Sequence, residues 1–270
     1  TTQLNALTTT QFASLSAIQV GGLTTAQMAS LSTDHVKALT TGQAATLSAN
    51  QLNGLGSSQL AAMDTADVAA LNASAVGKLS TANVAALSSD QVKAFSAAQL
   101  QTLGSAQVQA LGNDVAALGT SQLANLKATQ VSAMTTAQLN SLSTTQLRSL
   151  TGSQVAGLTT AQITSLDSAE LNALTTAQFS SISAAQLNAL SSIGTLSTTN
   201  LAALNNDAVA GLSTGAIQAL TTDQVTQLTA AQVKSLTTAQ LNAMEAADVA
   251  KLTTSQVAAL KAEQVGGLST

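Results

Sequence analysis

The side chains best suited to chemistry in this sequence are a single histidine and three closely spaced pairs of acids. His35 has no second metal-ligating or catalytic residue near it, so we interpret it as a surface residue in a helix-capping position. Two carboxylates three residues apart suit glycoside hydrolysis or calcium binding. The pairs are isolated from one another, however, and we predict that each one caps a helix. They are Asp64/Asp67, Asp167/Glu170 and Glu245/Asp248.

The other polar groups do not assemble a reactive site. No Ser has a histidine base, and the absence of Cys excludes thiolate nucleophiles, disulfides and thiolate metal sites. Gly21-Gly22 and Gly266-Gly267 lack the surroundings of a phosphate loop, and we assign them to helix C-termini. Asn72-Ala73-Ser74 is the one N-glycosylation triplet. We therefore predict no catalytic, cofactor-binding or metal-binding residue, no cofactor and no enzymatic activity.

The composition excludes several classes of partner. Of the 270 residues, 45% are hydrophobic and 7% are charged, with a net charge of −4 at pH 7. Lys and Arg together number 8, too few for a nucleic-acid surface or an anionic membrane. No apolar run approaches the ~18 residues of a spanning helix, so we expect no membrane insertion. No signal peptide is visible, and because the chain starts at Thr1 without a Met we expect it to be a piece of something longer.

An eight-residue repeat accounts for nearly the whole sequence. From Leu7 to Leu268 an apolar residue recurs every eight residues, and the register breaks only at 111–117 and 190–195. We number each octad from this residue, so that position 2 is usually Ser or Thr, position 5 is usually Gln, and position 6 is a second large apolar residue. We predict a single continuous array over residues 1–270. Its octads occupy residues 7–110, 118–189 and 196–267.

The order of residues within the octad predicts a helix start. The Ser or Thr hydroxyl at position 2 accepts from the backbone N–H of the residue at position 5. The Gln side chain at position 5 accepts in return from the backbone N–H at position 2, which completes a capping box. The apolar residues at positions 1 and 6 pack together as a hydrophobic staple. All 12 acids lie at positions 2 to 5, if the short unit at 111–117 is numbered in the same way, and six of the eight bases lie at positions 7 or 8. A helix dipole favours this distribution of charge. Each octad is therefore expected to form one helix of about six residues.

A single long helix and a β-solenoid fit the repeat less well. In one continuous helix each octad advances about 80° beyond two full turns, so the apolar residues circle its surface. A β-solenoid suits Thr and Val, but positions 1 and 6 differ in parity and nothing in a β-coil sorts the charges. One octad cannot fold alone, because its two buried side chains contribute about 3–6 kcal/mol while ordering eight residues costs about 12 kcal/mol. We therefore predict an all-α solenoid or superhelix of very short capped helices, one per octad, with small residues at position 8 allowing close approach. We expect the two short units to shift the winding or introduce a kink.

The repeats L-T-T-A-Q-L, as in 236–241, and L-S-x-x-Q-V-x-A-L resemble repeat tracts of very large secreted or surface proteins of bacteria that are described as adhesin-like. The resemblance implies an extracellular fibre or stalk and carries over no functional residue. At both ends the octad is cut between positions 2 and 3. This fits either a window on a longer array or copies that stack end to end.

The leading functional hypothesis is a structural filament or fibre protein, extracellular or on the cell surface, that associates with itself end to end or laterally. One alternative is a passive spacer stalk of a bacterial surface adhesin. Another is an ice- or glycan-binding surface made by the second Thr of each Thr-Thr pair. These pairs are Thr24-Thr25, Thr135-Thr136, Thr159-Thr160 and Thr237-Thr238.

Overall fold

The protein is all-helical, as the repeat predicts. The computed structural model describes residues 2–269, and within this range it contains short helices and no strand. The chain divides into two compact units, residues 1–142 and 143–270. Most helices have only four to six residues, and each complete octad contributes one of them.

The first unit contains seventeen α-helices and one 3₁₀ helix in the described residues: α1 (Thr2–Asn5), α2 (Thr9–Ala13), α3 (Ala17–Gly21), α4 (Thr25–Ser30), α5 (Thr33–Lys37), α6 (Thr41–Ala44), α7 (Ala49–Gly54), α8 (Ser57–Ala61), α9 (Thr65–Ala70), α10 (Ala73–Val76), α11 (Thr81–Ala85), α12 (Ser89–Lys93), α13 (Ala97–Thr102), α14 (Ser105–Ala110), η1 (Gly112–Ala117), α15 (Thr120–Ala124), α16 (Ala128–Ala133) and α17 (Thr136–Asn140).

The second unit continues with the same kind of element: α18 (Thr144–Ser149), α19 (Gly152–Ala156), α20 (Thr160–Ser165), α21 (Ser168–Ala173), α22 (Thr176–Phe179), α23 (Ala184–Ala189), η2 (Ile193–Thr195), α24 (Thr198–Ala202), α25 (Asn206–Ala210), α26 (Thr214–Gln218), α27 (Thr222–Gln227), α28 (Ala230–Ser235), α29 (Thr238–Ala243), α30 (Ala246–Val249), α31 (Thr254–Ala259) and α32 (Ala262–Gly266).

The octad around α4 shows how the sequence starts and stops each helix. Thr24 has an extended backbone and its side chain accepts from the N–H of Gln27, which begins the helix. The helix ends at Leu31, whose N–H bonds to the carbonyl of Met28 and whose own backbone is again extended (φ −60°, ψ 139°). Ser32 is extended as well and caps α5. Two consecutive extended residues, at positions 1 and 2, therefore turn the chain from one short helix into the next.

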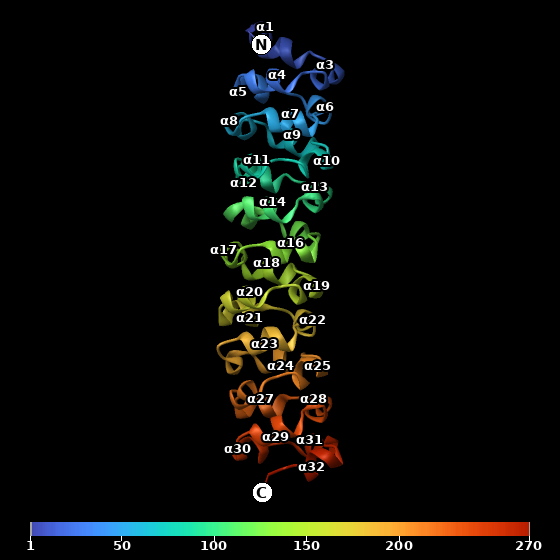
Figure 1. Ribbon diagram of the computed structural model, residues 1–270, viewed down its shortest axis with the longest axis vertical. Helices are drawn as coiled ribbons and strands as arrows, with labels where there is room; N and C mark the ends of the chain where they lie inside the picture. The colour runs from blue at the N-terminus through green and yellow to red at the C-terminus, as the bar shows by residue number, and fades with distance from the viewer. Residues whose placement is uncertain (1, 270) are drawn as a thin grey trace. The chain divides into compact units, whose positions relative to one another are not determined.

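Within each unit the helices stack with three helices to a turn. Most helices pack against the third helix after them, so that α3 contacts α6, α4 contacts α7 and α5 contacts α8 (Figure 1). In the second unit α20 contacts α23 and α25 contacts α28 in the same way. The sequence left the number of octads per turn open, and the contacts define each unit as a solenoid with a 24-residue turn wherever the octads are complete.

Positions 1 and 6 form the core of the stack. Leu52, at position 6, has no exposed surface, and Leu55, at position 1 of the next octad, is 2% exposed. Position 8 lies where successive turns come closest: a Cβ added to Gly54 would lie 2.7 Å from the side chain of Thr25 and 3.0 Å from its carbonyl oxygen. The small residue at Gly54 therefore lets α7 approach α4, as predicted for position 8.

The two short units keep the order in which helices pack within their own units, and the predicted shift of winding or kink stays a prediction. The seven-residue unit at 111–117 folds as η1, which packs against both α12 and α17 and thus takes the place of one helix. In the second unit α22 packs on α24 and α23 packs on α25, with η2 counted between them. Gly112 has a φ of +54°, a left-handed conformation that favours glycine, and it lets the chain enter η1 directly from Leu111.

Candidate functional site

The most regular arrangement of polar groups in the structure centres on the glutamine at position 5. In α7 the N–H of Ser48 donates to Gln51 Oε1 at 2.9 Å, and the N–H of Gln51 donates to Ser48 Oγ at 3.3 Å. This is the capping box that the sequence predicts, and it recurs along both units. It satisfies two of the backbone N–H groups that every helix N-terminus leaves without an intrahelical partner.

The same glutamine also caps a second, distant helix. Gln51 Nε2 donates to the carbonyl oxygens of Val20 at 3.0 Å, Gly21 at 3.1 Å and Leu23 at 2.9 Å, which lie 31, 30 and 28 residues earlier. These carbonyls lie at and just beyond the end of α3, where helical hydrogen bonding stops. One side chain therefore caps its own helix at the N-terminus and another helix at the C-terminus.

This double role is general. The glutamines whose Nε2 donates to backbone carbonyls between 26 and 31 residues earlier are Gln43, Gln51, Gln59, Gln91, Gln99, Gln107, Gln122, Gln130, Gln138, Gln178, Gln186, Gln224, Gln232, Gln240, Gln256 and Gln264. Most of them are fully buried, because the next turn of the solenoid covers them.

Sequence reasoning missed the second role, although a signal for it was present. A capping box accepts either Glu or Gln at this position. The octads nevertheless have 22 Gln and a single Glu, Glu170. A carboxylate can accept from the cap N–H but cannot donate to a carbonyl, so the strong preference for Gln indicates that the amide N–H groups are needed.

Asparagine at position 7 supplies a second link between turns. Asn53 Nδ2 donates to the carbonyl of Lys78 at 2.8 Å, and Asn53 Oδ1 accepts from the N–H of Ser80 at 2.7 Å. A side chain near the end of one octad thus bonds to both sides of the apolar residue that starts an octad further along. The same pair of bonds is made by Asn5, Asn172, Asn188 and Asn242.

His35 takes the place of a glutamine and is buried, so its assignment as a surface residue is wrong. Its Nε2 lies 2.8 Å from the carbonyl oxygen of Leu7, 28 residues earlier, and its Nδ1 lies 2.6 Å from Ser32 Oγ. The carbonyl can only accept, so Nε2 donates to it, while Nδ1 pairs with the hydroxyl. The ring also packs edge-on against Phe12, with 5.1 Å between the ring centroids. His35 therefore bridges two turns as Gln51 does.

The three acid pairs behave differently from one another. Asp167 and Glu170 form a complete capping box, as predicted: the N–H of Glu170 donates to Asp167 Oδ1 at 2.7 Å and the N–H of Asp167 donates to Glu170 Oε2 at 2.8 Å. Asp64 and Glu245 make no side-chain cap, so the capping assignment is wrong for these two pairs. Their partners at position 5 are Asp67 and Asp248, whose side chains are shorter than that of Gln or Glu.

Asp67 and Asp248 are both buried within their turns. Asp248 Oδ1 accepts from Thr222 Oγ1 at 2.6 Å, whereas Asp67 Oδ2 has no hydrogen-bond partner among the described residues. Burial, together with the nearby charge of Asp64, raises the pKa of Asp67 to about 6. Asp67 is thus an acid held where a neutral amide usually lies.

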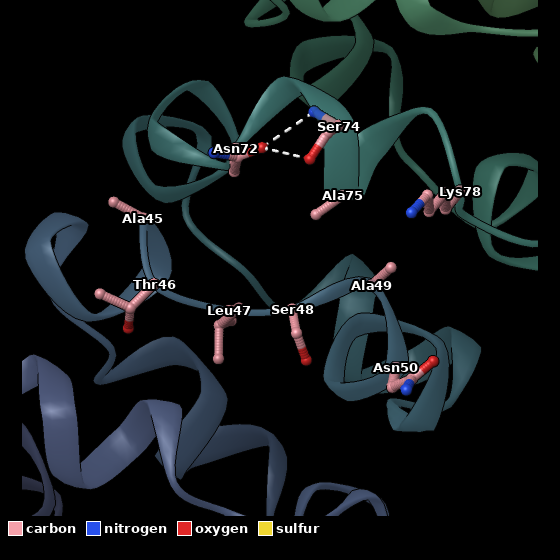
Figure 2. Close-up of a pocket in the computed structure, with 10 residues that line it drawn as sticks. All are labelled: Ala45, Thr46, Leu47, Ser48, Ala49, Asn50, Asn72, Ser74, Ala75 and Lys78. Atoms are coloured by element: carbon pink, nitrogen blue, oxygen red, sulfur yellow. Dashed lines mark hydrogen bonds between the residues drawn. The ribbon is translucent and has the colours of Figure 1, made fainter.

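The remaining predicted features have structural roles. Gly21 and Gly266 end α3 and α32, as assigned, but the residues that follow have negative φ and do not use a left-handed cap. In the glycosylation triplet, Asn72 caps α10, and its Oδ1 accepts from both the N–H and the hydroxyl of Ser74 (Figure 2).

The Thr-Thr pairs do not form a ladder along the solenoid. The first Thr of each pair makes a capping box, as predicted. A ladder made by the second Thr needs another Thr one 24-residue turn away. A threonine does follow Thr136 after 24 residues, at Thr160. Alanine takes that place after Thr25, Thr160 and Thr238, at Ala49, Ala184 and Ala262, so no column continues.

Three octads have alanine at position 5, and a pocket lies beside each of them. The pockets have volumes of about 450 Å³ at Ala75, about 310 Å³ at Ala208 and about 220 Å³ at Ala216. Figure 2 shows the first, with Ala75 facing the segment from Leu47 to Ala49 across the opening. The absence of a glutamine side chain therefore leaves room between turns.

These side chains hold turns together. No cluster of three or more His, Asp or Glu residues with metal-binding geometry occurs within residues 2–269. None of the helices in that range has the length and apolar character needed to cross a bilayer. The fold and the glutamine network define a helical solenoid built from tandem repeats, in which the repeat itself has a structural role.

Comparison with known families identifies the repeat. The ALTTAQ repeat family matches residues 1–33, 60–96, 113–144, 136–168, 209–238 and 233–270, which together make up more than half of the chain. The chain belongs to the ALTTAQ repeat family. A comparison with curated proteins finds no match.

Proposed function

We propose an extracellular structural role for the chain, in which it forms filaments or fibres and has no enzymatic activity. The observation that carries the proposal is that the first and last turns of the array present complementary groups. A second copy, or further octads of the same polypeptide, would continue the stack at either end by the contacts that already join successive turns.

The first turn presents hydrogen-bond donors and leucines. Gln11, Gln19 and Gln27 make capping boxes, but no carbonyl among the described residues accepts from their Nε2 groups. Leu7 and Leu15, at position 1, are half-buried, whereas Leu55 in the interior is 2% exposed. This turn thus presents the amide and apolar groups that elsewhere cover the preceding turn.

The last turns present the opposite set of groups. Val257 and Val265, at position 6, are 50% and 53% exposed, whereas Val225 at the same position in the interior is fully buried. The carbonyls of Val257 and Leu260 occupy the places that accept from a glutamine amide in earlier turns, and no such amide reaches them within the described residues. Carbonyls and valines at one end therefore fit amides and leucines at the other.

Electron microscopy and light scattering test the filament. The 270-residue chain is expected to form linear assemblies whose mean length grows with protein concentration. Val257→Lys places a charge in the apolar contact and should shorten them, while the control Ala137→Lys changes an exposed position 4 inside the array and should leave them unchanged. Discrete particles at every concentration would contradict the filament.

Such discrete particles would favour the alternative of a passive spacer in a bacterial surface adhesin. The repeat style supports an origin in a secreted or surface protein, and so does the coat of Ser, Thr, Asn and Gln with few charges. A weakly charged surface also reduces repulsion between neighbouring molecules, which supports lateral association of filaments. The ice- or glycan-binding alternative has less support, because Ala49 and Ala262 interrupt the threonine columns.

A further inference from the structure

The pocket beside Ala75 corresponds to an empty glutamine position. In the octad of α7, the Gln51 amide occupies this place and bonds to carbonyls 31, 30 and 28 residues earlier. Counting back in the same way from Ala75 gives the carbonyls of Ala44, Ala45 and Leu47. The Ala44 carbonyl accepts from the N–H of Leu47, but no donor among the described residues reaches the carbonyl oxygens of Ala45 and Leu47.

The opposite side of the pocket has an unused donor. Where glutamine is present, its Oε1 accepts from the N–H of the capping residue, as with Ser48 and Gln51 at 2.9 Å. The capping residue of α10 is Asn72, and its N–H has no acceptor in the part of the chain that the structure describes. Asn72, Ala45 and Leu47 all line the same pocket of about 450 Å³ (Figure 2). Two free acceptors and one free donor therefore belong to residues that line the pocket, at the positions that a glutamine amide joins in the octad of Gln51.

We propose that this pocket binds a small molecule carrying a primary carboxamide, held in the orientation of the missing glutamine side chain. The ligand's NH₂ group donates to the carbonyl oxygens of Ala45 and Leu47, and its oxygen accepts from the N–H of Asn72. A carboxylate of the same shape offers no donor to the two carbonyls, and an alkylammonium offers no acceptor to Asn72. Gln51 and Gln99 make these same bonds in their own octads with their side-chain amides.

The other two alanine pockets lack the full set of free groups. Beside Ala208, the carbonyl of Ser180 already accepts from Asn205 Nδ2 at 2.9 Å. Beside Ala216, the N–H of Ser213 already donates to Asn188 Oδ1 at 2.8 Å. The Ala75 pocket is also the largest of the three. The proposal is therefore confined to Ala75.

Lys78 adds a preference among carboxamides. It lines the Ala75 pocket, and its side chain extends toward the opening (Figure 2). A ligand with a carboxylate at its far end, such as glutaramate, is expected to bind more tightly than propionamide. Lys78→Met should remove that difference and leave propionamide binding unchanged.

Titration of the ¹⁵N-labelled chain with propionamide, followed by NMR, tests the site. The Asn72 N–H resonance is expected to shift saturably, with a dissociation constant on the order of millimolar for so small a ligand. Propionate is the matched control and should produce no saturable shift. Ala75→Gln fills the position with the chain's own amide and should abolish the propionamide response.

A second variant keeps the test decisive if Ala75→Gln does not fold. Gln99 bonds to the carbonyls of Val68 and Leu71 and accepts from the N–H of Ser96, so Gln99→Ala opens an equivalent position. This variant should gain a second saturable propionamide site, reported by the Ser96 N–H. Equal shifts with propionamide and propionate, an undiminished response in Ala75→Gln, or no new site in Gln99→Ala would each overturn the proposal.

Discussion

The two short units differ in length by one residue, and the octads that follow them differ in the residue at position 5. After the seven-residue unit at 111–117, the next three octads keep glutamine at position 5. Gln122 and Gln130 still reach back, to the carbonyls of Phe95 at 2.6 Å and Leu103 at 2.8 Å, but over 27 residues instead of 28. Gln138 reaches the carbonyl of Gly112 over 26 residues at 3.0 Å. The loss of one residue is therefore accommodated without loss of the network.

After the six-residue unit at 190–195, glutamine disappears for three octads. Position 5 is occupied by Asn200, Ala208 and Ala216, the three octads whose connection to an earlier turn would cross this unit. Glutamine returns at Gln224, whose bond to the carbonyl of Leu196 again spans 28 residues. The comparison indicates that the amide tolerates a turn shortened by one residue, whereas a turn shortened by two residues coincides with removal of the amide.

The largest expected effect concerns the side chain that keeps the six-residue unit in the stack. Ile193 lies in η2 and is 2% exposed, so Ile193→Ala should lower the free energy of unfolding by about 2–5 kcal/mol. Ile18→Ala is the control, because Ile18 is 86% exposed, and it should have little effect. Urea unfolding followed by circular dichroism measures both. An equally mild response to the two changes would mean that η2 does not act as a helix of the stack.

The second prediction separates the two roles of glutamine. Gln130→Glu keeps an acceptor for the N–H of Lys127 but replaces the donor to the carbonyls of Leu100 and Leu103 with a carboxylate. The variant should be less stable by about 1–3 kcal/mol, because buried carbonyls lose their partner.

The matched control is Gln19→Glu. Gln19 caps the N–H of Ser16 and has no distant carbonyl in the described residues, so the same substitution should leave the unfolding midpoint nearly unchanged. Equal losses in the two variants would show that only the N-terminal cap matters.

Asp67 extends the comparison to an octad of full length that lacks glutamine. Its pKa is raised to about 6, so the folded chain binds a proton more tightly than the unfolded chain, whose aspartate has a pKa of 3.8. Stability should therefore fall as the pH rises from about 4 to about 6, and it should stay low above that range.

Asp67→Asn should remove this pH dependence and raise the stability at pH 7 by about 1–2 kcal/mol, because the neutral amide can donate where the charged acid cannot. Thermal unfolding at several pH values between 4 and 7 measures the difference between the two proteins. Parallel profiles for the wild type and the variant would contradict the assignment of the titration to Asp67.

The smallest expected effect compares two asparagines at position 5. Asn83 Nδ2 donates to the carbonyl of Leu52 at 3.2 Å, over the usual 31 residues, so Asn83→Ala should lower the stability by about 1 kcal/mol. Asn200 Nδ2 is buried without a partner in the described residues, beyond the six-residue unit, so Asn200→Ala should be neutral or slightly stabilising. Calorimetry measures the stability of the two variants. A larger loss of stability in Asn200→Ala than in Asn83→Ala would contradict this prediction.

Local structure could be predicted from the sequence because the interactions that set it lie within one octad. The cap made by Thr135 and Gln138 joins residues three apart, and the apolar residues at positions 1 and 6 mark the core within every octad; the structure confirms both. The three-helix turn could not be predicted, because it depends on the angle that two extended residues impose between successive helices. That angle is not encoded in the spacing of apolar residues.

The polar network was only half predictable for a related reason. The burial of His35 depends on the Leu7 carbonyl, 28 residues away, which no local pattern indicates. The capping assignments at Asp64/Asp67 and Glu245/Asp248 were wrong because an Asp side chain at position 5 is not equivalent to the longer Glu side chain. At position 5, Glu170 completes a capping box, whereas the shorter Asp67 and Asp248 do not.

The distance over which each glutamine acts has a consequence for synthesis on the ribosome. The end of α3 receives its amide from Gln51, so it stays open to solvent until about thirty more residues have emerged. Each newly made octad therefore completes one that was translated earlier, and the finished part of the chain always trails the growing end by slightly more than one turn. Such a molecule folds in the order in which it is made. A translation pause would leave only the most recently made turn without its glutamine hydrogen bonds.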